Sequence, residues 1–177
     1  MTMLSGFSPV GLLLSVVLLA GCGQGSHSPP PRTADSELLG KPVPPITRTA
    51  LDGTKVSTAE LKGRVVVFEF FAEYCVPCRA ALPAAVSAQR ERPEATFIGI
   101  SEDDGPDTAQ QMANQYAVPF KVVHDQDRVI AARLRVQDLP VTIVLDGTGV
   151  VRWVGTTAIS KDDLVRVIDD VSRPAGQ

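Results

Sequence analysis

The sequence predicts an α/β sandwich, in which helices pack against a central β-sheet. Two observations lead to this class. Apolar, strand-like segments alternate with helical segments along residues 64–172, which is typical of layered α/β folds. Turn signals at Asp52-Gly53 and Asp146-Gly147 each join two short extended segments, and these hairpins add antiparallel strands at both ends of the domain.

The start of the chain has the pattern of a secretory signal. Its apolar run, Val10–Ala20, is too short to cross a hydrocarbon core of roughly 30 Å. The run leads into LAGC at residues 19–22, and in these four residues the chain resembles a bacterial lipoprotein precursor. The resemblance implies that Cys22 is lipidated and that residues 1–21 are removed, although this segment contains no Lys or Arg.

The residues after Cys22 have the composition of a linker, because they are polar, rich in Gly and Ser, and then rich in Pro. A buried N-terminal helix with an incidental cysteine is the alternative, but the Gly and Pro residues disfavour it. The expected organisation is a signal peptide (1–21), a lipidated cysteine with a flexible tether (22–36), one domain (37–173) and a tail (174–177).

The composition limits what this domain can do. About 140 residues are enough for one hydrophobic core. The net charge of −3 is small, and no basic stretch indicates nucleic-acid binding. Of the three cysteines, Cys22 is assigned to the lipid, which leaves Cys75 and Cys78 with only each other. In an exported compartment such a Cys-x-x-Cys pair is free to cycle between dithiol and disulfide.

The elements of the domain follow from local patterns. RVVVFEFF, residues 64–71, is nearly continuous apolar sequence, as expected of a strand buried on both faces. The last helix begins after Ser160, a favourable N-cap with acidic residues behind it. The expected strands are 46–49, 55–57, 64–71, 96–101, 120–124, 141–145 and 150–154. One helical turn is expected at 57–61, and a helix that opens with the cysteine motif is expected to run to about residue 90. The other expected helices are 107–116, 127–134 and 161–172.

Around the two cysteines the chain resembles the thioredoxin fold, and more closely the TlpA/ResA-like thiol–disulfide oxidoreductases. YCVPCR at residues 74–79 corresponds to the Trp-Cys-x-Pro-Cys-Lys/Arg motif of that family. Pro83 lies where the family kinks the helix, Glu69 takes the position of the buried acid, and Leu139-Pro140 that of the cis-proline loop. The resemblance spans about residues 39–172 and implies a thioredoxin-like three-layer α/β/α sandwich with a mixed central sheet and an N-terminal β-hairpin extension.

Thiol exchange gives each cysteine an expected role. Cys75 falls where a strand becomes a helix, so unpaired N–H groups and the helix dipole favour its thiolate. The thiolate attacks a client disulfide, and the less exposed Cys78 then attacks the mixed disulfide and releases the reduced client. Pro77 fits the first turn without removing a needed donor. The redox-active disulfide Cys75–Cys78 is expected to work without a cofactor or a metal.

Glu69 is an acidic residue inside an apolar strand, where a carboxyl group is costly to bury. We expect burial to raise its pKa and the carboxylate to accept the proton of Cys78. The alternative is that its side chain reaches solvent at the end of the strand. Glu73 and Arg79 flank the motif and are expected to be surface charges.

The client site is expected to lie on both sides of Cys75. A cis bond before Pro140 would place the backbone of Leu139 beside this cysteine, where it offers a short strand pairing to an extended client. A trans proline that starts an ordinary strand is the alternative. Tyr74, Val76 and Pro77 are expected to line the same site.

Four other interpretations of the cysteine pair remain open. A zinc site needs about two more ligands, and only His27 and His124 are available. A Sco-like copper-binding module has a similar fold but uses Cys-x-x-x-Cys and a distant His. A peroxiredoxin-like thiol peroxidase shares the opening segment, but its Pro-x-x-x-Thr-x-x-Cys environment is missing here. A purely structural disulfide across so short a loop constrains little of the unfolded chain.

The resemblance implies an extracytoplasmic enzyme, held by its lipid at the periplasmic face or the outer membrane. As a monomer it is expected to reduce disulfides in client proteins and to be recharged by a membrane electron-transfer reductase. Oxidant and isomerase roles are the alternatives, because direction depends on the reduction potential. Tyr74 stands where the family has Trp, and Ala81 stands where many cytochrome c-maturation members have Glu, which weakens that narrower role.

Overall fold

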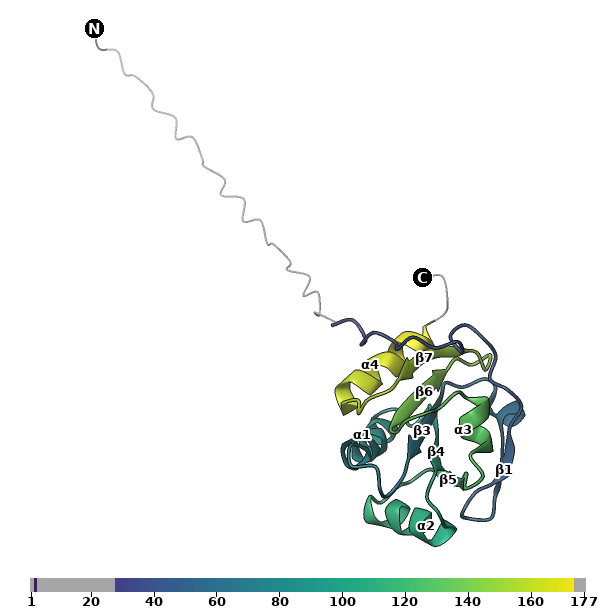
Figure 1. Cartoon of the computed structure of the whole chain (residues 1–177). Coiled ribbons are helices and arrows are strands. Elements are labelled where there is room, and N and C mark those ends of the chain that lie inside the picture. Colours follow the sequence, from purple (N-terminus) through teal and green to yellow (C-terminus); the bar gives the residue numbers. More distant parts are fainter. Residues whose placement is uncertain (1, 3–27, 174–177) are drawn as a thin grey trace.

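A mixed sheet of five strands forms the middle layer of the computed structural model, which describes Thr2 and residues 28–173 (Figure 1). The strand order is β5-β4-β3-β6-β7. β3, β4 and β5 are parallel, and β6 is antiparallel to both of its neighbours. The bounds are β3 Val66–Phe71, β4 Thr96–Ser101, β5 Lys121–His124, β6 Val141–Leu145 and β7 Val151–Gly155, preceded by a hairpin of β1 Thr47–Thr49 and β2 Lys55–Ser57.

Helices cover both faces of this sheet, which confirms the predicted three-layer fold (Figure 1). α1 (Cys78–Glu91), α2 (Pro106–Gln115) and α4 (Lys161–Ser172) pack on one face. α3 (Val129–Arg133) and the β1–β2 hairpin pack on the other. A short 3-10 helix, η1 (Thr58–Leu61), follows β2 where one helical turn was predicted.

The central strand β3 is buried at every position, as predicted for a strand covered on both faces. Phe68 and Phe70 pack into the cluster beneath α3, whereas Val67 and Phe71 pack on the side of α1. Side chains of a strand alternate between the two faces. Glu69 therefore points to the face that α1 covers.

Several helix bounds differ from the predicted ones. α1 begins at Cys78 with Pro77 as its N-cap, so Cys75 lies in the turn before the helix. α3 has only five residues, since Arg128 before it takes a left-handed conformation with φ 51°. The predicted N-cap of α4 is confirmed, because the Ser160 side chain accepts a hydrogen bond from Asp163 N–H.

The segment 31–34 runs along the outer edge of β7. Ala34 N–H donates to the carbonyl of Val154 at 2.7 Å, and Val154 N–H donates to Thr33 Oγ1 at 2.9 Å. Trp153 Nε1 donates to the carbonyl of Pro31 at 3.0 Å. An uncovered sheet edge invites pairing with other chains, and these contacts cover it. Part of the predicted tether thus packs on the domain, while the boundary at residue 37 stays a prediction.

Apart from Thr2, the predicted signal peptide (1–21) falls outside the residues that the structure describes, as do the predicted lipidated Cys22 and the tail at 174–177. Within the described part, no helix has both the length and the apolar character needed to cross a bilayer.

Candidate active site

Cys75 and Cys78 form a disulfide just beyond the carboxyl end of β3, with their Cα atoms 5.3 Å apart. β3 ends at Phe71, and a turn that Cys75 N–H closes onto Ala72 O leads to the first residue of α1. The backbone N–H of Cys78 points at Cys75 Sγ, 3.2 Å away. A backbone donor at this distance stabilises the thiolate that forms on reduction.

The two sulfurs differ in their access to solvent. Cys75 retains an exposed fraction of 6%, whereas Cys78 has none. Tyr74 and Val76, the neighbours of Cys75, are 60% and 68% exposed. Exposed apolar groups around a reactive atom are typical of a binding surface. Cys75 is therefore the more accessible of the two sulfurs.

Glu69 is completely buried on the face of β3 that α1 covers. Its Oε2 accepts a hydrogen bond from Thr142 Oγ1 at 2.7 Å, and Oε1 has no hydrogen-bond partner among the described residues. Burial raises the pKa of Glu69 to about 8, against the lowering effect of the Thr142 hydroxyl. The alternative in which this side chain reaches solvent is wrong.

The peptide bond between Leu139 and Pro140 is cis, as predicted. Pro140 is buried directly before β6. Leu139 is half-buried and packs against the apolar cluster that contains both cysteines. The loop thus lies next to the disulfide, although its part in client binding stays a prediction.

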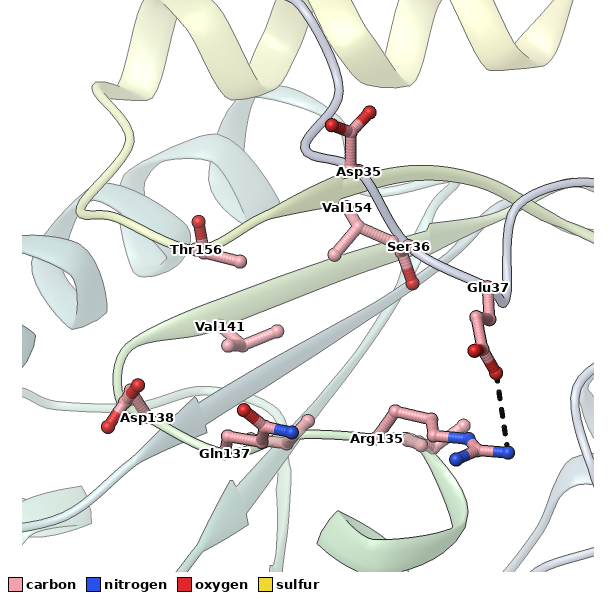
Figure 2. A pocket seen from close by; sticks show the side chains of 11 residues that line it. Asp35, Ser36, Glu37, Arg135, Gln137, Asp138, Val141, Val154 and Thr156 are labelled. Carbon is pink, nitrogen blue, oxygen red and sulfur yellow. Dashed lines mark ion pairs between the residues drawn. The ribbon is translucent and has the colours of Figure 1, made fainter.

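A hollow of about 540 Å³ opens beside this loop (Figure 2). Asp138 and Val141, which flank Leu139-Pro140, line one side. Glu37 from the segment before β1 lies on another side and pairs with Arg135 at 3.4 Å. The volume is within the range of about 300–1,000 Å³ that ligand pockets have. The hollow thus borders the cis-proline loop, and neither cysteine lines it.

Polar residues after β4 also reach the cysteine loop, and no motif in the sequence singles them out. Asp103 Oδ1 accepts a hydrogen bond from the N–H of Glu73 at 2.7 Å. His124 was predicted to be a strand-end residue. Its Nε2 lies 2.7 Å from the carbonyl oxygen of Asp103. The one available signal is that β3 and β4 are parallel, so the residues that follow them meet at the same edge of the sheet.

In the described part of the chain, no three His, Cys, Asp or Glu side chains are grouped so that they could hold a metal ion. Glu73 and Arg79 are exposed, as predicted.

Comparison with known proteins identifies the relatives of this chain. The model of the AhpC/TSA family matches residues 39–154. This chain belongs to the AhpC/TSA family. One relative of this chain is the probable thiol:disulfide interchange protein DsbE-2 of Pasteurella multocida. The two sequences are 29% identical over 150 residues, which cover 83% of this chain and 77% of the relative. The thiol-disulfide oxidoreductase ResA of Bacillus thuringiensis is 29% identical over 120 residues, which cover 66% and 69%.

A solved structure agrees with these relatives. The secreted disulfide oxidoreductase of Mycobacterium tuberculosis superposes with a TM-score of 0.66 at 26% identity, over 71% of this chain and 95% of that one. The predicted resemblance to ResA-like enzymes is thus confirmed. This AhpC/TSA family member is a thiol–disulfide oxidoreductase of thioredoxin-like fold with a Cys75–Cys78 pair.

Proposed function

We propose that the protein is a membrane-anchored, extracytoplasmic enzyme that reduces disulfides in client proteins. The unequal exposure of the two sulfurs carries the proposal, since it gives a client access to Cys75 while Cys78 stays covered. The description of the M. tuberculosis relative as secreted supports an extracytoplasmic location. LAGC at residues 19–22 supports the lipid anchor on Cys22.

In the first step the Cys75 thiolate attacks one sulfur of the client disulfide. A mixed disulfide forms between Cys75 and the client, and the second client sulfur leaves as a thiolate. An extended client segment pairs with the backbone of Leu139, and its neighbouring residues occupy the hollow beside Asp138. Tyr74, Val76, Pro77 and Pro140 line the approach to the reacting sulfur.

In the second step Cys78 attacks Cys75 Sγ and breaks the mixed disulfide. The client leaves with both sulfurs reduced, and the enzyme keeps the Cys75–Cys78 disulfide, so two electrons have passed to the client. Glu69 accepts the proton that Cys78 loses. Burial raises the pKa of Glu69 to about 8, so its ionised carboxylate is a stronger base than an ordinary one, and it takes the proton in those molecules in which it is charged.

A membrane electron-transfer reductase then returns two electrons to the disulfide. The anchor on Cys22 keeps the domain near this donor, because the residues between Cys22 and Pro31 extend at most about 30 Å. The enzyme acts as a monomer, and its redox-active group is the disulfide itself, without a cofactor.

The reduction potential of the Cys75–Cys78 couple, measured against glutathione, tests the direction. A reductant is expected near the value of thioredoxin, about −270 mV, whereas a value near that of the oxidant DsbA, about −120 mV, would contradict the reducing role. Peroxide consumption by the reduced domain is measured alongside, and we expect none. Rapid consumption would favour the thiol peroxidase instead.

A further inference from the structure

We infer that Ser101–Asp103, the last residue of β4 and the two that follow it, form a brace that positions both walls of the client site. One wall is the cysteine loop, residues 72–76, and the other is the cis-proline loop, residues 137–140. The inference rests on the proposed function, because the walls matter only if a client binds between them. It adds positioning residues that lie outside both motifs.

Asp103 holds the first wall. Its side chain is almost fully buried, with 2% of the residue exposed, and Oδ1 accepts a hydrogen bond from Glu73 N–H at 2.7 Å. Glu73 lies two residues before Cys75 in the turn that presents the sulfur. Hydrogen bonds between a carboxylate and a backbone N–H are short and about twice as strong as neutral ones. The carboxylate therefore fixes where the cysteine loop leaves β3.

The position of Asp103 is itself fixed from two other directions. Ser101 Oγ donates to Asp103 Oδ2 at 2.8 Å and accepts from the N–H of Asp103 at 3.2 Å. His124 Nε2 lies 2.7 Å from the carbonyl of Asp103. With its backbone and both carboxylate oxygens engaged, Asp103 has little freedom to follow a moving loop.

Glu102 connects the same segment to Arg128, the residue before α3. Its N–H donates to the carbonyl of Phe71 at 2.9 Å, and its side chain is 1% exposed. Its Oε2 lies 3.0 Å from Nη2 of Arg128, close enough for an ion pair but not aligned as a hydrogen bond. Burial raises the pKa of Glu102, and Arg128 opposes this. A carboxylate buried against one half-exposed partner adds little stability, which favours a positioning role.

Arg128 carries the link to the second wall. The same Nη2 that approaches Glu102 also donates a long hydrogen bond of 3.4 Å to the carbonyl of Gln137, two residues before Leu139. The backbone of Arg128 has φ 51°, a left-handed conformation that side chains disfavour. Such conformations persist where the surroundings fix them. The guanidinium thus spans from the end of β4 to the cis-proline loop.

The brace predicts a specific kinetic pattern for two variants, Asp103→Ala and Arg128→Met. Asp103→Ala removes the hydrogen bond to Glu73 N–H, and Arg128→Met removes the one to the Gln137 carbonyl. An extended client therefore binds less well, while a small disulfide still reaches Cys75. The KM for insulin reduction is expected to rise about threefold to tenfold, the effect of one lost hydrogen bond. The second-order rate constant with oxidised glutathione is expected to change less than about twofold.

Two further variants serve as controls. Asp103→Asn keeps an oxygen that accepts from Glu73 N–H, and it is expected to restore the KM for insulin. Arg133→Met removes an arginine at the end of α3 that donates to the Pro45 carbonyl at 2.7 Å, away from both walls, and its KM is expected to match the wild type.

The brace is overturned if Arg128→Met leaves the insulin KM unchanged, if it slows insulin and glutathione equally, or if Arg133→Met has the same effect. It is also overturned if Asp103→Asn is as defective as Asp103→Ala. Arg128 is half-exposed, so its variant decides the question even if Asp103→Ala fails to fold. Failure of the wild-type enzyme to react with both probes would instead contradict the proposed function, and the brace with it.

Discussion

Glu69 is the single side chain that we pair with one step of the proposed reaction, the loss of the proton from Cys78. Its position inside an apolar strand is visible in the sequence as FEFF, because a charged residue among buried ones requires a reason. Its partner Thr142 lies directly opposite on β6 and donates to the carboxyl group. With a pKa near 8, the carboxyl is mostly protonated at neutral pH and ionises more fully just above it.

Replacing Glu69 with Gln is expected to change how stability depends on pH. The pKa of Glu69 is about 4.5 in the unfolded chain and about 8 in the folded one, so between these values the unfolded chain releases a proton that the folded one keeps. The free energy of unfolding of the wild type therefore falls across this window by about 1.4 kcal/mol per pH unit relative to the variant. Urea unfolding of both oxidised proteins at several pH values measures this difference, and parallel profiles would contradict the buried acid.

Asp103 illustrates a residue that the sequence could not identify. SEDD at residues 101–104 looks like an ordinary solvated turn after a strand. Asp103 contacts the cysteine loop only because β3 and β4 pair in parallel. Local sequence patterns do not specify this pairing. Glu69 could be predicted because its anomaly is local, whereas the role of Asp103 is created by tertiary contacts.

At the scale of elements, the strands were predicted within two residues, because buried strands have short apolar sequences with clear ends. Helix ends were less predictable. The turn at residues 75–77 precedes α1 because Cys75 N–H and Cys78 N–H close successive turns onto Ala72 and Cys75. The contact of residues 31–34 with β7 was missed, since a Pro-rich segment gives the same linker signal whether or not a sheet edge is available to it.

The edge strand β7 depends on a close approach between Gly155 and Trp153. A Cβ at Gly155 would lie 2.7 Å from Cζ3 of the indole, too close for any side chain. Gly155→Ala is therefore expected to displace the indole, break its hydrogen bond to Pro31 and destabilise the fold by about 1–3 kcal/mol. The chain has one tryptophan, so its fluorescence reports the change directly.

Gly147→Ala is the matched control, since a Cβ there meets nothing closer than 3.5 Å. An unchanged emission spectrum and unfolding midpoint in Gly155→Ala would mean that the indole does not pack across this glycine.

For the whole molecule, the topology explains why the site forms where it does. β3 and β4 end at the same edge of the sheet, and β6 starts there because it runs in the opposite direction. The cysteine loop, the residues after β4 and the cis-proline loop therefore meet, although they are about 30 to 65 residues apart in sequence. The family resemblance made the meeting of the cysteine and cis-proline loops predictable but not the part of the residues after β4, whereas composition and periodicity alone gave only the layered α/β class.

The proposed anchor makes a prediction about the location of the whole chain. Replacing Cys22 with Ser is expected to release the domain from cell membranes into the soluble extracytoplasmic fraction, because a lipid attached to this thiol is the proposed membrane anchor. Immunoblots of membrane and soluble fractions measure it, with the Cys75→Ser variant as the control that stays bound. Retention of the Cys22→Ser protein on membranes would contradict the lipoprotein assignment.

The central claim is that Cys75 meets the client and Cys78 resolves the bond. Capture of clients by the Cys78→Ser variant tests it most directly, because the mixed disulfide can no longer be resolved from within. Cells that express this variant are expected to accumulate covalent complexes, which a reducing agent dissolves and mass spectrometry maps to Cys75. The same complexes in Cys75→Ser cells, or none in Cys78→Ser cells, would contradict the assigned roles.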